Sequence, residues 1–192
     1  MAEETAREWW TGEAGNAYTD RNQVDWRARR PFWAQIMDMT GARSVFEMGA
    51  NAGWNLSAIK DVRPGVQVIG NDVNAQACAQ AKSAGINVIN QFDFNFYVPG
   101  KHELVFTAGV LIHIPPDDLR ETMQALIDKS LRYVLAVEYD ASDEEMIEYR
   151  GESNRLWKRP YGAMYEVLGL KVVHFTDVLP GFDRCSAWLM EK

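Results

Sequence analysis

Apolar and polar positions along the chain follow two alternating patterns, one typical of strands and one typical of helices. Short runs rich in Val, Ile, Leu and Phe predict strands at 44–48, 67–71, 86–90, 103–108, 132–138, 170–176 and 186–190. Helix-like spacing and helix-start signals predict helices at 26–39, 52–62, 74–84, 116–130 and 160–168. Residues 5–22 predict short helical turns, and the polar residues 139–158 predict an irregular segment.

Single residues mark several predicted helix ends. Gly41 follows the helix at 26–39, as a C-terminal glycine often does. Asn74 stands where an N-cap is expected, and Pro116 falls in the first turn of its helix. These signals support the boundaries that the apolar spacing predicts.

The alternation of strands and helices predicts an α/β fold with a mostly parallel, Rossmann-like sheet and helices on both faces. We expect one structural domain, with residues 1–40 as a helical lid or substrate segment and 41–192 as the ligand-binding part. In such sheets, ligands bind at the carboxyl ends of the strands, near the point where the strand order reverses. The candidate polar residues below follow strands at those ends.

Composition is that of a soluble globular protein, with 47% hydrophobic and 24% charged residues. The formal net charge of −7 disfavours a polymeric nucleic acid or an anionic membrane as partner. The most apolar run, 104–114, is too short to span a bilayer. Cys78 and Cys185 lie far apart, and no signal peptide is visible, so we expect a reduced, cytoplasmic protein. No cluster at metal-ligand spacing is visible, so no metal is expected.

The first glycine turn reads Glu47-x-Gly49-x-Asn51-x-Gly53 and follows the strand at 44–48. This spacing matches neither the dinucleotide fingerprint nor a P-loop. A carboxylate before the turn would repel a pyrophosphate but attract an ammonium or a sulfonium. The turn therefore favours S-adenosylmethionine, which carries both cations and no phosphate. The alternative is that Glu47 is a surface carboxylate at a strand end.

Two further acids follow the next predicted strands. Asp72 can accept hydrogen bonds from both ribose hydroxyls, a role shared by NAD and S-adenosylmethionine sites, or it can cap the following helix in place of Asn74. Asp93 can accept from an adenine amino group, and Phe94 can stack on the ring. The alternative for Phe94 is a place in the core.

These motifs, together with GVLIHIPP at 109–116, resemble the ordered motifs of class I S-adenosylmethionine-dependent methyltransferases over residues 43 to 138. The sequence departs from that family at Asn51, where Gly is usual. Asn tolerates a left-handed backbone better than most residues, so the turn can survive.

A longer resemblance covers almost the whole chain. FEMGANAGWNL, FTAGVLIHIPP, EYRG, RLWKRPYG and YTDRN look like the pseudaminic acid biosynthesis-associated methylases. The resemblance implies a seven-stranded sheet with an antiparallel last strand, and methyl transfer to a small sugar-like or amine-bearing molecule. The chain departs from that family in an acidic stretch at 143–145 and at Pro160, both within the expected substrate loop.

The predicted cofactor site combines the turn, the acids and the N-terminal segment, in which Arg21 is of the right type to pair with the methionine carboxylate. Its residues are Tyr18, Arg21, Asn22, Glu47, Gly49, Asn51, Gly53, Asn55, Asp72, Val73, Asp93, Phe94, Ala108 and Gly109. We expect Trp9, Trp10, Trp26 and Trp33 to belong to the lid or the core.

Methyl transfer requires an aligned acceptor and often a base. His113 and Glu138 follow the strands at 103–108 and 132–138 and are candidates for that base, with Tyr139 beside them. The alternatives are a structural histidine in an apolar loop and a carboxylate that caps a neighbouring loop.

A local positive cluster stands out in this acidic chain. Arg150, Arg155, Lys158 and Arg159, with Tyr161, are predicted to bind an anionic group on the acceptor. The alternative is a solvated helical face that pairs with the acids at 143–145.

The sequence thus predicts a methyltransferase acting on an amine or hydroxyl of a small, anionic molecule such as a sugar or a nucleotide-linked sugar. Three other functions stay open: methylation of a nucleobase, nucleotide or peptide, cofactor binding without turnover, and a dehydrogenase.

Overall fold

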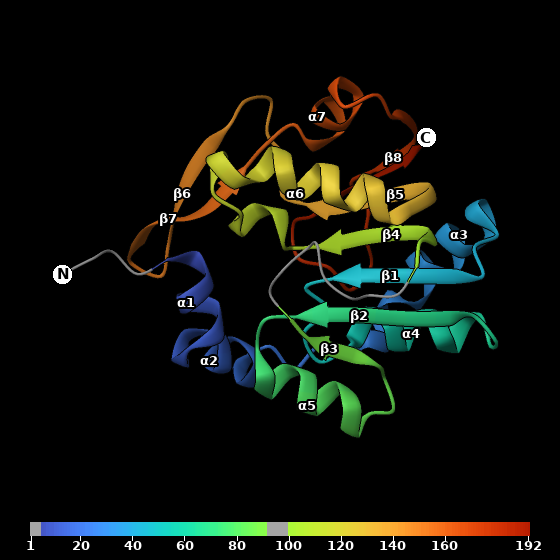
Figure 1. Cartoon of the computed structure of the whole chain (residues 1–192), viewed down its shortest axis with the longest axis horizontal. Coiled ribbons are helices and arrows are strands. Elements are labelled where there is room, and N and C mark those ends of the chain that lie inside the picture. The colour runs from blue at the N-terminus through green and yellow to red at the C-terminus, as the bar shows by residue number, and fades with distance from the viewer. Residues whose placement is uncertain (1–4, 92–99) are drawn as a thin grey trace.

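The computed structural model describes residues 5–91 and 100–192 (Figure 1). The helical elements are α1 (Ala6–Thr11), α2 (Glu13–Arg21), the 3-10 turn η1 (Trp26–Arg29), α3 (Arg30–Thr40), α4 (Trp54–Val62), α5 (Ala75–Ser83), the 3-10 turn η2 (Leu111–His113), α6 (Pro116–Lys129) and α7 (Tyr161–Val167). The strands are β1 (Ser44–Met48), β2 (Gln67–Asp72), β3 (Val88–Asn90), β4 (His102–Ala108), β5 (Ser130–Glu138), β6 (Glu145–Tyr149), β7 (Glu152–Lys158), β8 (Lys171–Thr176) and β9 (Ser186–Glu191).

Seven strands form one sheet in the order β3-β2-β1-β4-β5-β9-β8. The first five pair in parallel, whereas β9 is antiparallel to both β5 and β8. The predicted α/β class, the parallel sheet and the antiparallel last strand are confirmed. The order reverses between β1 and β4, so the carboxyl ends of these two strands border the place where such sheets bind ligands.

Apolar side chains fill both faces of the sheet. Helices α3, α4 and α5 pack on one face, around a core that includes Trp33, Leu56 and Phe106. Helices α6 and α7 pack on the other face, around a core that includes Met123 and Tyr165. Because strands β1, β4 and β5 are covered on both faces, their middles carry consecutive apolar residues, as in Leu104–Phe106 and Tyr133–Val137, rather than an alternating pattern.

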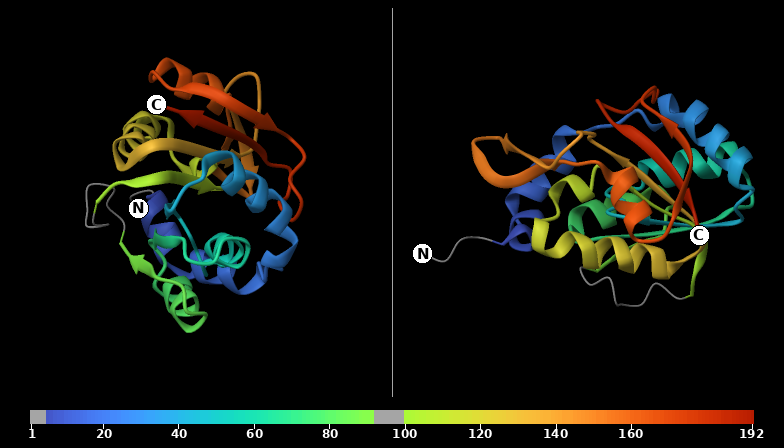
Figure 2. Two further views of the ribbon diagram at one scale, coloured as in Figure 1. Left: turned by 90° about the vertical axis from the view of Figure 1, so that its right-hand side faces the viewer. Right: turned by 90° about the horizontal axis from the view of Figure 1, so that it is seen from above.

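The remaining elements lie beyond the carboxyl ends of the parallel strands. In Figure 1 the arrowheads of β1, β2 and β4 point towards α1, α2 and the hairpin of β6 and β7. The view from above in Figure 2 places the same elements at that end. Of the predicted N-terminal lid at 1–40, α1 and α2 therefore lie over the strand ends, whereas α3 contributes Phe32, Trp33, Ile36 and Met37 to the core.

The prediction of an irregular segment at 139–158 was wrong. Residues 145–149 and 152–158 form an antiparallel hairpin with a sheet of its own. All of β6 and the first half of β7 are exposed or only partly buried. Polar side chains outnumber apolar ones there, so the apolar pattern that marks a buried strand is weak. Burial begins at Arg155, Leu156 and Trp157, where the hairpin meets the body of the protein.

Local signals at helix ends are confirmed. Gly41 ends α3 with φ +60°, a left-handed conformation that glycine adopts without steric cost. Asn74 caps α5, because its side-chain oxygen accepts a hydrogen bond from the amide of Ala77 at 2.9 Å.

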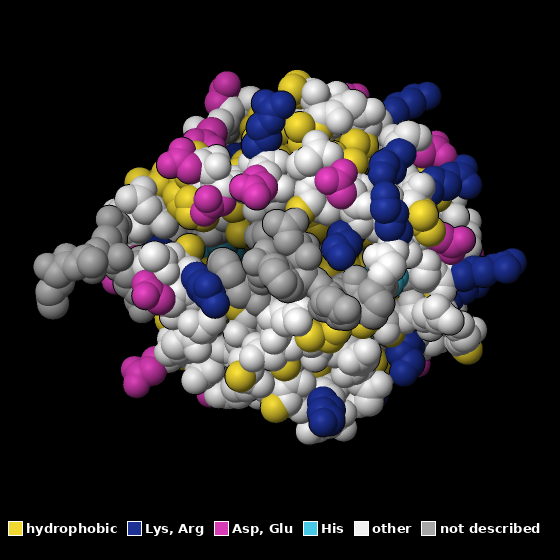
Figure 3. Space-filling view, in the orientation of Figure 1, with side chains coloured by type: hydrophobic (Ala, Val, Ile, Leu, Met, Phe, Trp, Pro, Cys, Tyr) yellow, Lys and Arg dark blue, Asp and Glu magenta, His cyan; other side chains and the backbone are white. Residues whose placement is uncertain are grey.

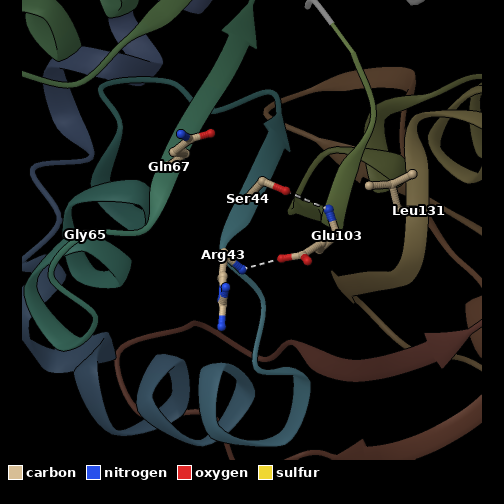
Figure 4. A pocket seen from close by; sticks show the side chains of 6 residues that line it. All are labelled: Arg43, Ser44, Gly65, Gln67, Glu103 and Leu131. Carbon is tan, nitrogen blue, oxygen red and sulfur yellow. Dashed lines mark hydrogen bonds between the residues drawn. The ribbon is translucent and has the colours of Figure 1, made fainter.

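A shallow pocket opens at the opposite edge of the sheet, where the parallel strands begin. Figure 4 shows its lining residues, which are Arg43, Ser44, Gly65, Gln67, Glu103 and Leu131. The Arg43 amide donates to the Glu103 carboxylate at 2.5 Å across this edge. None of the predicted site residues lines this pocket.

The first testable prediction concerns the core under α3. Trp33 is 0% exposed, its ring centroid lies 4.6 Å from that of Phe106, and its indole N–H donates to Asn55 at 3.3 Å. We expect Trp33→Ala to lower the free energy of unfolding by about 3–5 kcal/mol, measured by urea denaturation. Met39→Ala on the same helix is the control, because Met39 is 42% exposed. An equal loss in both variants would contradict this packing.

Candidate functional site

The turn after β1 adopts the left-handed backbone that its sequence favours. Gly49, Asn51 and Gly53 have φ values of +70°, +46° and +74°. A side chain at Gly49 would place its Cβ 2.4 Å from the Val110 side chain, so the turn packs closely on the loop after β4. Asn51 thus adopts a left-handed conformation at the position where the family that the sequence resembles usually has glycine, as expected for an asparagine.

Glu47 ends up in the interior with one oxygen unused. The residue is 1% exposed, and its Oε1 accepts a hydrogen bond from Asn55 at 2.6 Å. No described residue donates to its buried Oε2. Burial raises the pKa of Glu47 to about 8. A buried carboxylate oxygen without a donor is costly, and a cationic or N–H-bearing ligand would relieve that cost.

A chain of polar contacts connects Glu47 to an arginine that the sequence analysis missed. Asn55 Oδ1 accepts from Arg29 Nη1 at 2.8 Å and from the Trp33 indole, so the predicted ligand Asn55 is occupied within the protein. Arg29 also donates to the carbonyl of Gly181 and stacks on Phe182. Arg29 falls in the basic stretch WRARR, in which sequence spacing does not distinguish the arginine that turns inward.

Asp72 lies at the end of β2, next to the glycine turn. Its Oδ2 accepts from the Asn51 amide and its Oδ1 from the Asn74 amide, both at 2.8 Å. Burial raises its pKa, and the Asn74 and Asn51 amides act in the opposite direction. The carboxylate therefore holds the turn and lies at the carboxyl end of β2. The cap of α5 is Asn74 rather than Asp72.

Helices α1 and α2 are fastened to the same two strand ends. The Asn51 side chain donates to the Thr19 hydroxyl at 3.1 Å. The Asn74 side chain donates to Asn16 at 2.8 Å and to the Trp10 carbonyl at 3.3 Å. The N-terminal helices thus cover the turn that carries Asn51 and the loop that follows Asp72.

The predicted N-terminal residues connect α2 to the hairpin. Arg21 donates to the Tyr149 hydroxyl at 3.3 Å, and its guanidinium carbon lies 5.4 Å from the Tyr18 ring. Asn22 donates to the Tyr18 carbonyl at the end of α2. Burial raises the pKa of Tyr18, so its hydroxyl stays protonated at neutral pH.

His113 lies in an aromatic cluster built from three elements. Its ring centroid is 4.6 Å from that of Trp10 on α1 and 5.3 Å from that of Tyr149 on β6. Trp9 closes the cycle by contacting both Trp10 and Tyr149. His113 Nδ1 lies 2.6 Å from the Arg155 carbonyl. Because a carbonyl only accepts, Nδ1 carries the proton and Nε2 keeps its lone pair.

Burial keeps this histidine uncharged. It lowers the pKa of His113 to about 4, although the hydrogen bond to the Arg155 carbonyl favours the protonated form. At neutral pH the imidazole is therefore neutral and its Nε2 can accept a proton.

Glu138 and Tyr139 differ sharply in exposure although they are neighbours. Glu138 is 0% exposed and accepts from the Val110 and Ile112 amides at 3.3 Å each. Burial raises its pKa to about 7. Tyr139 is half-buried, and burial raises its pKa to about 12. The structure places Glu138 beneath the loop after β4 and Tyr139 at the end of the strand.

The predicted cationic cluster is spread over several environments. Arg150 lies exposed at the hairpin turn with φ +56°, Arg155 is buried with its guanidinium 6.0 Å from the Trp9 ring, and Lys158 is half-buried. Arg159 is 0% exposed and pairs with Glu144 at 2.7 Å, a pairing with the acids at 143–145 that the alternative interpretation anticipated. Tyr161 is fully buried against Trp188.

The other predicted contacts fall at the same strand ends. All three are partly buried: Val73 follows β2, Ala108 is the last residue of β4, and Gly109 follows it. Asp93 and Phe94 lie outside the described residues. Within residues 5–91 and 100–192, no three His, Cys, Asp or Glu side chains group as metal ligands do. No helix in that part of the chain is long and apolar enough to cross a membrane.

Comparison with solved structures identifies many proteins of the same fold. Magnesium protoporphyrin IX methyltransferase from Synechocystis PCC 6803, with bound S-adenosylmethionine, matches with a TM-score of 0.74 at 11% identity, over 100% of this chain and 99% of that one. A Burkholderia thailandensis 1,6-didemethyltoxoflavin N1-methyltransferase, with bound S-adenosylhomocysteine, gives 0.76 at 14% identity, over 100% and 92%. A sugar N-methyltransferase from Streptoalloteichus sp ATCC 53650 gives 0.69 at 14%, over 100% and 95%.

No family model matches the chain, and no curated protein matches it. At these identities, the structural likeness shows the fold, which is the Rossmann-like fold of S-adenosylmethionine-dependent methyltransferases.

The buried carboxylate of Glu47 gives a prediction about stability and pH. Its pKa is raised from 4.5 to about 8 in the folded protein, so ionisation costs stability progressively as the pH rises from about 4.5 to about 8. Glu47→Gln keeps an acceptor for Asn55 and has no charge to bury. From pH 5 to pH 9, we expect the variant to gain on the order of 2–4 kcal/mol relative to wild type, measured by urea unfolding.

Glu103→Gln at the other edge of the sheet is the matched control, because Glu103 also accepts a hydrogen bond. If the difference in unfolding free energy between Glu47→Gln and wild type stays constant from pH 5 to pH 9, the raised pKa of Glu47 is refuted.

Proposed function

We propose that the chain is an S-adenosylmethionine-dependent methyltransferase acting on a small molecule. One observation carries the proposal: a buried carboxylate oxygen, Glu47 Oε2, has no described donor and stands behind a left-handed glycine turn at the strand-order reversal. The fold shared with methyltransferases that hold this cofactor or its product supports it.

The residues at the strand ends fit this cofactor. Glu47 Oε2 offers an acceptor for the methionine ammonium. Asp72, at the edge of the sheet, offers carboxylate oxygens to the ribose hydroxyls. Arg29 is the better partner for the methionine carboxylate, because it lies on the Glu47–Asn55 network, whereas Arg21 bonds to Tyr149. Burial raises the pKa of Glu47 to about 8, and a cation beside it would favour its ionised form, whereas a pyrophosphate would raise that pKa further, which disfavours a dinucleotide.

The bound cofactor supplies an electrophilic methyl group on a sulfonium. The chain supplies acceptor binding, alignment and proton removal. His113 presents a neutral Nε2 and is our candidate for the group that accepts the acceptor's proton. Trp10, Tyr18 and Tyr149, from α1, α2 and β6, cover this end of the sheet and exclude water from it.

For the acceptor, we propose an amine or hydroxyl of a sugar or a nucleotide-linked sugar. The resemblance to pseudaminic acid-associated methylases and the fold shared with a sugar N-methyltransferase support this class. Arg150 and Lys158 are the candidate contacts for an anionic group. A polymer is disfavoured by the net charge of −7 and by the mixing of basic and acidic side chains over the described part of the face in Figure 3.

The cofactor is tested by calorimetric titration of S-adenosylhomocysteine, S-adenosylmethionine and NADH. We expect both adenosyl ligands to bind wild type and NADH to give no heat. We expect Asp72→Ala to weaken adenosyl binding about 100-fold, because charge-assisted hydrogen bonds to the ribose are lost. Asp128→Ala, at an exposed position on α6, is the control and should bind as wild type does. Heat from NADH alone would favour a dehydrogenase and overturn the proposal.

The acceptor class is tested by acceptor-dependent release of S-adenosylhomocysteine. We expect release with amino sugars or nucleotide-linked amino sugars and none with oligonucleotides or peptides. His113→Gln should lower turnover at least tenfold while its affinity for S-adenosylhomocysteine stays unchanged. Release with a nucleobase or a peptide alone would replace the proposed acceptor class, and tight cofactor binding without any release would indicate a protein without turnover.

A further inference from the structure

The loop after β4, residues 110–114, carries His113 and makes few main-chain hydrogen bonds of its own. It contains the 3-10 turn η2, which is three residues long. Within the loop, the His113 amide donates to the Val110 carbonyl and the Ile114 amide donates to the Leu111 carbonyl. So short a turn leaves other amides and carbonyls without partners in the turn, and buried main-chain groups need partners.

A buried carboxylate takes the amides. Glu138, at the end of β5, accepts from Val110 through Oε1 and from Ile112 through Oε2. The residue is fully buried, and each of its two oxygens has a main-chain donor. Both oxygens of the carboxylate therefore bind the main chain of the loop at 110–114.

A buried guanidinium takes the carbonyls. Arg159, between β7 and α7, donates from Nη1 to the Leu111 and Ile114 carbonyls at 3.0 Å each. Its Nε donates to Glu144, which balances the charge of this fully buried side chain. Two opposite charges from distant parts of the chain thus hold one loop.

We infer that Glu138 and Arg159 are positioning residues, which fix the main chain of 110–114 and so hold His113 with Nε2 as its unprotonated nitrogen. The use of this orientation in methyl transfer rests on the proposed function. The fixed position of the loop does not depend on that function. The third contact of the loop completes the arrangement, because His113 Nδ1 donates to the Arg155 carbonyl.

The hold depends on the charge of Glu138. An ionised carboxylate only accepts hydrogen bonds, whereas a protonated one turns one oxygen into a donor that faces an amide. Burial raises the pKa of Glu138 to about 7, so the loop should loosen as the pH falls below about 7. The titratable groups that face this carboxylate are Tyr161 and Tyr165 of α7 and Cys185 before β9.

None of these neighbours changes charge near pH 7. Burial raises the pKa of Tyr161 and Tyr165 above the usual tyrosine value and that of Cys185 to about 12. Burial lowers the pKa of His113 to about 4. Glu47, whose pKa is raised to about 8, also titrates in this range, and the turn after it packs on Val110, so a loop transition that persists in Glu47→Gln would report Glu138.

The test uses nuclear magnetic resonance on the full chain, without any acceptor. Hydrogen exchange reports the protection of the Val110 and Ile112 amides, and imidazole ¹⁵N shifts report the His113 tautomer, with its signal identified by its loss in His113→Gln. In wild type, we expect a single tautomer at pH 8 and at least a tenfold fall in the protection factors of both amides from pH 8 to pH 6.

Two variants and a control complete the test. Glu138→Gln should show low protection of one of these amides at every pH, because its side-chain amide can offer an oxygen to only one of them. Arg159→Lys should show mixed His113 tautomers, because an ammonium has a single nitrogen and cannot bind Glu144 from one atom and both loop carbonyls from another, as Arg159 does through Nε and Nη1. Glu103→Gln removes a carboxylate that also accepts a main-chain amide, at the other end of β4 (Figure 4), and should behave as wild type does.

Wild-type protection of both amides in Glu138→Gln, with a single His113 tautomer, would overturn the inference. If Glu138→Gln does not fold, the measurement on wild type is sufficient. Protection factors of both amides that stay constant from pH 6 to pH 8 would also overturn the inference. Titration of S-adenosylhomocysteine separates the two proposals. If the loop responds as expected but the protein does not bind S-adenosylhomocysteine, the proposed function is wrong and the positioning role of Glu138 and Arg159 still holds.

Discussion

Two buried carboxylates near the carboxyl ends of parallel strands determine how the chain is arranged at that end of the sheet. Glu47 is the next-to-last residue of β1 and Glu138 is the last residue of β5, and both are almost fully excluded from water. A buried carboxylate must find donors or pay a large desolvation cost. Glu138 finds two main-chain amides, whereas Glu47 finds one side-chain amide and keeps one oxygen without a donor among the described residues. The same residue type therefore serves the fold at one strand end and suits a ligand at the other.

The sequence predicted the frame of the site well because that frame depends on local patterns. Strand ends, the left-handed glycine turn and the Asn74 cap all follow from short-range preferences, and the structure confirms them. The sequence left two roles open for Glu138, a base or a cap on a neighbouring loop, and only its tertiary contacts with the Val110 and Ile112 amides favour the cap. Arg29 was missed for the same reason, since only the tertiary fold brings it to Asn55. The hairpin was missed because exposed strands carry a weak apolar pattern.

The N-terminal helices connect the two halves of the site. They are bound to the turn after β1 and the loop after β2 through Asn51 and Asn74. They also carry Trp9 and Trp10, which pack against His113 and Tyr149 on the other side. Displacement of α1 and α2 would therefore disturb the proposed cofactor contacts and the proposed acceptor contacts together.

The hairpin of β6 and β7 forms a two-stranded sheet separate from the main one. No ladder of the seven-stranded sheet depends on its sequence, and its outer half is exposed. Substitutions, insertions or a grafted loop between Arg150 and Asn154, the exposed part of the hairpin beyond Tyr149, can therefore accumulate at little cost to folding. The tip of the hairpin is thus a surface that can change in what it recognises while the strand ends beneath it keep their contacts.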